Sequence, residues 1–550
     1  MKFKIIAAIS IMIILFIGCD ITQTLNEEPP HIITSDILYN NYSGFQTGIN
    51  AAYSEIRYEL EASRMPKQIF VNGTDNMSSN YVSNFGNIAT KWGDHNNSES
   101  SYLSRPFDWL YSIINATNTI IDRAEGENID WNGGDGSEVE NMNFVIAEAK
   151  AIRAWAYRHL TYLWGDVPLS LAESAGNSIK TDWERTPVNE VRTQIIEDLL
   201  FAEQHIPVEP IPGRMSKGVI QHYLAEMYLV INDPEKALQW ADKVISTPEY
   251  KLITERYGVN LDKPGVAFMD MFYQGNINRE DGNTEALWVW QYGYQMIGGG
   301  TQPRSRAMQL QRYMDIKIGA VNPLQITFER GGRGKAYTAP TQWFMESFEP
   351  QDDRFSNHAV RQYFILKTAE QNAPSPSDKL PEGYAFGDTI KLNWSNPLTA
   401  ENWQVKDWPY SRKFEGSIPD NVASDFNYDD YIAVRLADTY LLKAEAQFKL
   451  GNSPGAAETI NIIRRRSNAS DVSAGDINID FILDERSREL FDEEYRRYTL
   501  LRTGKWLERT RAHNTFGGEK VSERDILFPI PQAVIDANLT STMPQNPGFD

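Results

Sequence analysis

The sequence predicts an all-α, mainly helical protein in which tetratricopeptide-like helical hairpins form a scaffold that carries long irregular loop insertions. Three observations predict this: long stretches with apolar residues at helical spacing, a hairpin pattern that occurs twice, and two segments rich in Gly, Pro, Asn and aromatic residues. Apolar residues make up 41% of the chain, enough to build a large core without disulfides. We therefore expect a single large folded domain over residues 31–550.

The amino-terminal segment is predicted to be a secretion signal followed by a tether. Two lysines precede an apolar run from residue 5 to 17, which is shorter than the roughly 20 apolar residues that a membrane-spanning helix needs. The only cysteine, Cys19, ends the run LFIGC, which resembles a bacterial lipobox. We therefore expect a signal peptide over 1–18, a Cys19 anchored by two or three acyl chains, and a polar tether over 19–30. The alternative is an ordinary signal peptide followed by an incidental cysteine.

Two segments in the amino-terminal half have the periodicity and boundary residues of long helices. The segment from residue 144 to 169 repeats small residues at helical spacing, so another helix can approach it closely. A second helix is predicted to begin with Thr186 as its N-cap and Pro187 at its first position, and to end before Pro207.

The hairpin pattern occurs at residues 223–245 and again at 441–466. Each copy reads as a helix containing Ala-Glu, a tight turn of Asn, Asp, Ser, Gly or Pro, and a second helix. Such hairpins stack into a right-handed scaffold, and scaffolds of this kind bind partners more often than they catalyse reactions.

Two irregular insertions interrupt the helices, at about 72–105 and about 250–425. Loops of this length inside a compact protein are usually functional or disordered, and their aromatic content favours order. We therefore expect a ligand to bind to these two insertions.

A charged segment from residue 482 to 506 carries acidic and basic side chains at three- and four-residue spacings. This spacing predicts ion pairs along one helix and no catalytic role. The residues are Asp484, Glu485, Arg486, Arg488, Glu489, Glu493 and Arg496.

Several motifs together resemble the SusD/RagB family of surface lipoproteins from the Bacteroidetes. Their number, order and spacing carry the resemblance, which spans essentially the whole mature chain. They are INAAYSEIR (49–57), AEAKAIRAWAYRHLTYLWGDVPL (147–169), RTPVNEV (185–191), GRMSKGV (213–219), YIAVRLADTYLLKAEAQFKLG (431–451), INIIRRR (460–466), ILDERSRELFDEEYRRYTLLRTGKW (482–506), LFPIP (527–531) and QNPGF (545–549).

The resemblance implies an α-helical fold with tetratricopeptide-like units and a lipid anchor in the outer membrane, exposed at the cell surface. It also implies a SusC-like TonB-dependent transporter as partner and a nutrient as ligand, mainly glycans and in some members peptides. The net charge of −21 argues against nucleic acid as a partner and leaves the lipid as the only expected membrane contact. No cofactor is expected, and a structural calcium stays open.

Aromatic and polar residues of the insertions are the candidate ligand contacts, because family ligand patches are built from loops of these regions. A sugar ring stacks its apolar C–H face on flat aromatic side chains, and its hydroxyls need hydrogen-bond donors and acceptors. The first insertion offers Asp75, Asn76, Tyr81, Phe85, Trp92 and Asp94, with Trp92 the strongest candidate. The second offers Tyr292, Tyr294, Arg304, Arg306, Tyr313, Arg333, Tyr337 and Trp343. For each aromatic residue the alternative is a place in the core.

The common catalytic patterns do not occur in the sequence. Seven histidines are scattered without an HExxH pair, no G-x-S-x-G occurs, and GGRGKA (331–336) lacks the first glycine and the Ser or Thr of a phosphate loop. We therefore predict a non-catalytic protein that captures glycans for a transporter. The alternatives are a peptide-binding import lipoprotein of the RagB type and a lipid-anchored enzyme that cleaves glycans.

Overall fold

The computed structural model describes residues 35–61, 66–80, 85–402, 404–418 and 420–549. Cys19, the predicted signal peptide and tether, and Tyr81 lie outside these residues. The long helices are α4 (Tyr42–Ile56), α8 (Ser101–Ala124), α9 (Glu138–Leu163), α10 (Val188–His205), α11 (Lys217–Val230), α12 (Pro234–Ser246), α16 (Leu436–Lys449), α17 (Ser453–Arg466) and α18 (Ile479–Leu490). The predicted helical fold class is thereby confirmed.

Shorter elements fill the segments between the long helices. The short helices are α3 (Ser35–Leu38), α5 (Lys67–Val71), α6 (Gly86–Thr90), α7 (Trp92–His95), α13 (Ala267–Asp270), α14 (Ser305–Gln309), α15 (Gln342–Glu346), α19 (Arg496–Arg502), α20 (Trp506–His513) and α21 (Gln532–Ala537). The strands are β1 (Met77–Ser78), β2 (Ala286–Trp290), β3 (Ala339–Pro340), β4 (Val360–Arg361), β5 (Tyr363–Ile365), β6 (Thr389–Lys391), β7 (Tyr410–Ser411) and β8 (Tyr431–Arg435). They form antiparallel pairs: β1 with β3, β2 with β8, β4 with β7 and β5 with β6.

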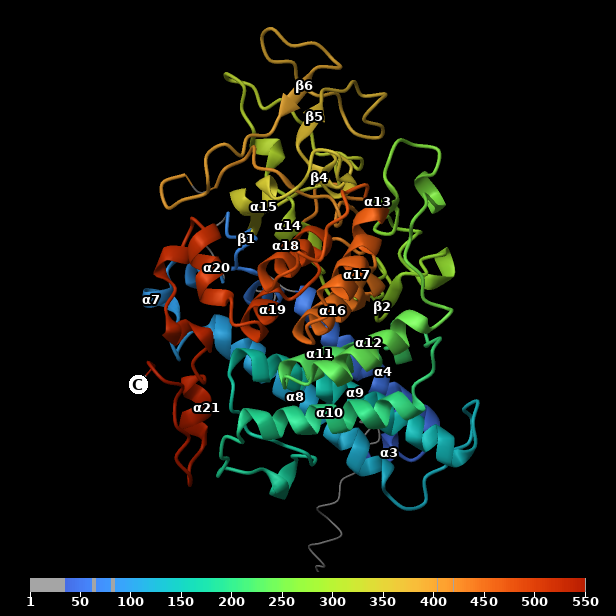
Figure 1. The fold of residues 1–550 in the computed structure, drawn as a ribbon. Helices are drawn as coiled ribbons and strands as arrows, with labels where there is room; N and C mark the ends of the chain where they lie inside the picture. The colour runs from blue at the N-terminus through green and yellow to red at the C-terminus, as the bar shows by residue number, and fades with distance from the viewer. Residues whose placement is uncertain (1–34, 62–65, 81–84, 403, 419, 550) are drawn as a thin grey trace, which may run out of the picture.

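Both predicted hairpins are present, as α11–α12 and α16–α17. Their second helices begin in the same way: Asp233 accepts a hydrogen bond from the backbone N–H of Lys236 (3.1 Å), and Asn452 accepts one from Gly455 (3.0 Å). Each helix also has a proline in its first turn, where no intrahelical N–H is needed. Helix α12 packs against α16, so the two hairpins form one stack although they are far apart in the sequence (Figure 1).

The start of α10 differs from the prediction. Thr186 does not cap the helix, because its backbone pairs instead with that of Val167 (N···O 2.9 Å). The first free N–H of the helix, on Val188, donates to the carboxylate of Asp166 in the preceding loop (2.8 Å). The helix itself lies where it was predicted.

The two insertions are ordered around short elements. The first ends at residue 100, where α8 begins, and the second reaches residue 430, just before β8. Because β2 pairs with β8, both ends of the larger part of the second insertion return to the helical body. In Figure 1 the strands β4, β5 and β6 lie at the end of the molecule opposite α3 and α10.

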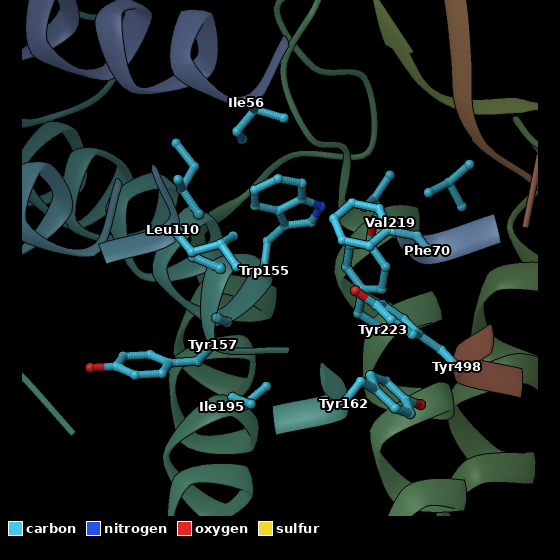
Figure 2. Close-up of a cluster of buried hydrophobic side chains, with 14 of the residues drawn as sticks. Ile56, Phe70, Leu110, Trp155, Tyr157, Tyr162, Ile195, Val219, Tyr223 and Tyr498 are labelled. Atoms are coloured by element: carbon cyan, nitrogen blue, oxygen red, sulfur yellow. The ribbon is translucent and has the colours of Figure 1, made fainter. Parts of the chain in front are cut away.

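Aromatic side chains of α9 lie in the middle of the apolar core (Figure 2). Trp155 and Tyr157 are buried, and Tyr162 stacks on Tyr498 of α19 with ring centroids 4.4 Å apart. His159 shares a hydrogen bond of 2.7 Å with the Tyr498 hydroxyl, and burial and the neighbouring Arg158 lower its pKa. The core therefore joins the amino-terminal helices to a carboxyl-terminal helix.

The charged segment forms a buried polar core. One of the predicted ion pairs along a helix is present, between Arg488 and Glu485 of α18 (2.8 Å), but the segment is not a single helix. Helix α18 ends at Leu490 and α19 begins at Arg496, so the segment turns. Glu485 contacts Arg354 and Arg464 at 2.7 Å each, and Glu489 contacts Arg435 at 2.6 Å. Both carboxylates are fully buried, and although burial raises their pKa, the surrounding guanidiniums hold it far below the usual value. Most of these pairs therefore link different elements.

We expect the substitution Glu489→Gln to lower the free energy of unfolding by about 3–5 kcal/mol, because it leaves buried guanidiniums without compensating charge. Unfolding by urea, followed by circular dichroism, measures the change. Glu458→Gln is the matched control, since Glu458 is 63% exposed and pairs on the surface with Arg465; we expect no measurable change there. Equal stability of both variants would contradict the prediction.

Candidate functional site

Trp92, the strongest candidate from the sequence, is a core residue. Its side chain is fully buried, with its ring edge-on to that of Trp506 at a centroid distance of 5.4 Å and the Arg497 guanidinium 5.5 Å away. Gly73 lies against the same ring, where a Cβ would come within 2.7 Å of the indole. Phe85, also a candidate, is buried beside Trp92. A ligand at the surface cannot stack on either ring.

Asp75 and Asn76 are also structural. The Asp75 carboxylate accepts hydrogen bonds from Arg496 and Arg509, each at 2.7 Å. Burial raises the pKa of Asp75, but the two guanidiniums outweigh this and hold it at about 2. The Asn76 amide donates to the Ser487 hydroxyl at 2.9 Å. The candidates of the first insertion that the structure describes are thus buried, except for Asp94, which is exposed on α7.

Candidates of the second insertion meet at one loop, residues 424–430, which we call the platform loop. Tyr294 packs on Tyr428 with ring centroids 5.3 Å apart and an angle of 57° between the rings. The Arg304 guanidinium lies 5.0 Å from the centre of the Phe426 ring. Tyr294 and Tyr428 are both half-buried, so each presents part of a ring to solvent. This places two aromatic surfaces next to each other at the surface.

Charged residues border the platform loop. Asp425 lies 3.7 Å from the Arg333 side chain and 3.1 Å from that of Lys335. Arg333 is 43% exposed and retains donors for a ligand. Tyr337, another candidate, is half-buried in the same loop, which leads into β3. Carboxylate and guanidinium groups thus stand beside the aromatic pair.

Arg306, a candidate from the sequence, positions the platform loop from beneath. Its side chain is buried and donates to the backbone carbonyls of Ser424 and Gly416. Burial lowers its pKa to about 10, against the opposing effect of Asp429. It therefore acts as a support and does not reach the surface.

The segment that carries Tyr294 is also fixed. Arg57 donates to the carbonyls of Gln291 and Gly298 at 2.6 Å each, which ties both ends of the turn to the end of α4. The backbone N–H of Tyr292 donates to Asp430 at 2.8 Å, and that of Asn427 donates to the Pro303 carbonyl at 3.0 Å. The two tyrosines are thus held by backbone contacts on either side.

Two acidic residues of the platform loop have raised pKa values. Burial raises the pKa of Asp429 to about 7, although Arg306 opposes the shift. Burial also raises the pKa of Asp430. A carboxyl that titrates near neutral pH can donate or accept a hydrogen bond, which suits a ligand bearing hydroxyls.

The remaining candidates do not belong to this surface. Tyr292 and Tyr313 are buried. Trp343 stacks on His513 with centroids 4.4 Å apart, under the Arg509 guanidinium.

The sequence interpretation missed the platform loop. Asp425, Phe426, Tyr428 and Asp429 were not among the candidates, because the second insertion was expected to end near residue 425. The signal that could have found them is the alternation of aromatic residues with Asp and Asn in DFNYDD, immediately before an apolar strand.

Two family models match the chain. The model described as "SusD family" matches residues 284–549, and that described as "Starch-binding associating with outer membrane" matches residues 33–229. The chain belongs to the SusD/RagB family. The SusD-like protein P2 of Formosa agariphila is 24% identical over the full length of both chains. The family predicted from the sequence is thereby confirmed.

Solved structures share the fold of this SusD-family chain. A laminarin binding SusD-like protein matches with a TM-score of 0.68 at 20% identity, covering 93% of this chain and 100% of its own. Surface glycan-binding protein A from Bacteroides fluxus matches with a TM-score of 0.66 at 16% identity, covering 92% and 99%. These likenesses confirm the helical, tetratricopeptide-like architecture.

Two further properties bear on the site. Within the described ranges, His, Cys, Asp and Glu side chains form no group of three or more that could hold a metal ion. Over the same residues, every helix is too short or too polar to cross a bilayer.

We expect Trp92→Ala to lower the free energy of unfolding by about 3–5 kcal/mol, because it removes a fully buried ring from a packed core. Tyr294→Ala, which trims a half-buried ring, should cost about 1 kcal/mol or less. Chemical denaturation of both variants tests the contrast. If the Trp92→Ala variant were as stable as wild type, this would contradict the assignment of Trp92 to the packed core.

Proposed function

We propose that this SusD-family protein is a non-catalytic, surface-exposed lipoprotein that binds glycans and delivers them to a SusC-like TonB-dependent transporter. The observation that carries the proposal is the Tyr294–Tyr428 pair, flanked by carboxylates and by Arg304 and Arg333. Two aromatic faces can stack on successive sugar rings, and the charged groups can bind their hydroxyls. The laminarin-binding and glycan-binding names of two structural neighbours support a glycan as ligand.

The mechanism is equilibrium binding. An oligosaccharide held on the platform loop above a transporter raises the local concentration of substrate at the transporter entrance. The supporting contacts from Arg57 and Arg306 hold the loop in the binding geometry before the ligand arrives, which reduces the entropic cost of binding.

A binding screen of residues 20–550 against plant, fungal, bacterial and host glycans and mixed peptides tests the site. We expect a glycan ligand whose affinity falls at least about tenfold, or about 1.4 kcal/mol, in the variant carrying Tyr294→Ala and Tyr428→Ala. Tyr384→Ala is the matched control, because Tyr384 is an exposed tyrosine away from the platform loop, and it should bind like wild type.

Other outcomes of the screen would favour the alternatives. Binding to peptides alone would indicate a RagB-type peptide importer, in which Arg304 and Arg333 would bind carboxylates. Release of reducing ends from any polysaccharide would indicate an enzyme. If the double tyrosine variant bound a glycan with full affinity, the glycan site would lie elsewhere than on the platform loop.

The anchor and the partner are tested in cells. Cys19→Ser should abolish incorporation of labelled palmitate and move the protein out of the membrane fraction, because no other lipid attachment point is proposed. Cys19→Ala serves as a second variant that also lacks a thiol, and both should behave alike. Affinity purification of the lipidated wild-type protein should recover a TonB-dependent transporter; recovery without one would contradict the partner.

A further inference from the structure

A cleft of about 570 Å³ lies in the second insertion, between the segment that precedes α13 and the strands β4 and β5. We call it the basic cleft. Its lining includes Arg256, Lys263, Tyr273, His358, Tyr363 and Arg412. In Figure 1 the strands β4 and β5 lie at the end of the molecule away from α3 and α10. None of the residues that form the Tyr294–Tyr428 surface lines this cleft.

The charge of the cleft is opposite to that of the protein. Four arginines and two lysines line it, against two glutamates. Most of these cations already have a carboxylate partner. Glu415 binds Arg361 and Arg412 at 2.7 Å each, and Glu329 binds Lys367. Two buried aspartates outside the lining, Asp270 and Asp378, bind Arg256 and Arg330 at 2.6 Å each. Six cations against these four carboxylates leave an excess of two positive charges. In a chain with a net charge of −21, this local excess is an exception that attracts anions.

Two side chains of the cleft would interact with a bound anion: Lys263 can bind it, and His358 would change its pKa. Lys263 is exposed, and its Nζ contacts the neutral side-chain oxygen of Asn260 at 3.0 Å. His358 is half-buried, and burial and the guanidiniums of Arg412, Arg256 and Arg361 lower its pKa. An anion bound beside these guanidiniums would offset their field and raise the pKa of His358.

Aromatic rings form part of the wall. Tyr363 of β5 is 37% exposed, and Tyr273 is half-buried. A small inorganic anion needs no flat apolar surface, whereas a charged sugar ring would use both the rings and the cations.

We propose that the basic cleft is a second binding site, for a sugar that carries an oxyanion, either a uronic acid carboxylate or a sulfate ester. The site extends the proposed glycan-binding function but uses different residues, so the two can fail separately. Its cations select for charge, while the Tyr294–Tyr428 surface recognises rings and hydroxyls.

Calorimetry with three oligosaccharides of equal length tests this site: an oligogalacturonate, a sulfated galactan fragment and a neutral glucan. We expect at least one anionic ligand to bind, and its affinity to fall at least about fivefold in Lys263→Ala and in Tyr363→Ala. The matched controls, Lys251→Ala and Tyr384→Ala, remove exposed residues outside the cleft and should bind like wild type. Raising the salt concentration should lower the affinity for the anionic ligand and leave the affinity for any neutral ligand unchanged. The preferred anionic ligand distinguishes carboxylate from sulfate.

A second readout locates the ligand. In protein with labelled histidine, the nuclear magnetic resonance signal of His358, assigned by its loss in His358→Gln, should titrate at a higher pH when the anionic sugar is bound. An unchanged His358 titration, unchanged affinity in both cleft variants, or no binding of either anionic sugar would overturn the proposal. Loss of anionic binding only in the Tyr294→Ala and Tyr428→Ala variant would assign that ligand to the platform loop instead.

Discussion

The rest of the structure depends on the pairing of a set of buried charges. Removing an ion from water costs several kcal/mol, and the cost is recovered only when opposite charges and hydrogen bonds surround the group. Here the requirement is met by side chains from distant parts of the chain: Asp75 of the first insertion, Arg354 and Arg435 of the second half, and Glu485 and Glu489 of α18. The segments that supply these groups must therefore occupy fixed places.

This constraint explains where a ligand can and cannot bind. The first insertion contributes its polar and aromatic residues to the interior, where Asp75 binds two arginines and Trp92 fills space against Trp506. The second insertion is supported from below by single buried cations such as Arg306, and its outer residues remain at the surface. The aromatic surface at Tyr294 and Tyr428 stays accessible to a ligand, because residues beneath it provide the hydrogen bonds that the loop backbone needs.

Local patterns in the sequence predicted the features that depend on interactions between residues close together in the chain. The helical periodicity of α9 and the paired hairpins with Asp233 and Asn452 at their turns agree with the structure. Thr186 does not cap α10, because the fold brings the carboxylate of Asp166, twenty residues earlier, to the first N–H of the helix. Asp75 and Trp92 failed as ligand contacts for the same kind of reason. Arg496 and Arg509, which bind Asp75, and Trp506, which packs on Trp92, lie more than 400 residues further along the chain. In addition, the same residue types serve in a core and at a sugar site.

The separation of these partners also determines when the protein can fold. Asp75 binds Arg496 and Arg509, which follow it by 421 and 434 residues. A chain synthesised from its amino terminus therefore carries this carboxylate without its partners until nearly the whole polypeptide has been made. The early helices likewise lack Tyr498, which completes their aromatic core. Such non-local contacts slow folding and leave apolar surface open to aggregation in the meantime. The nascent chain therefore cannot complete its core until its last segments have been made.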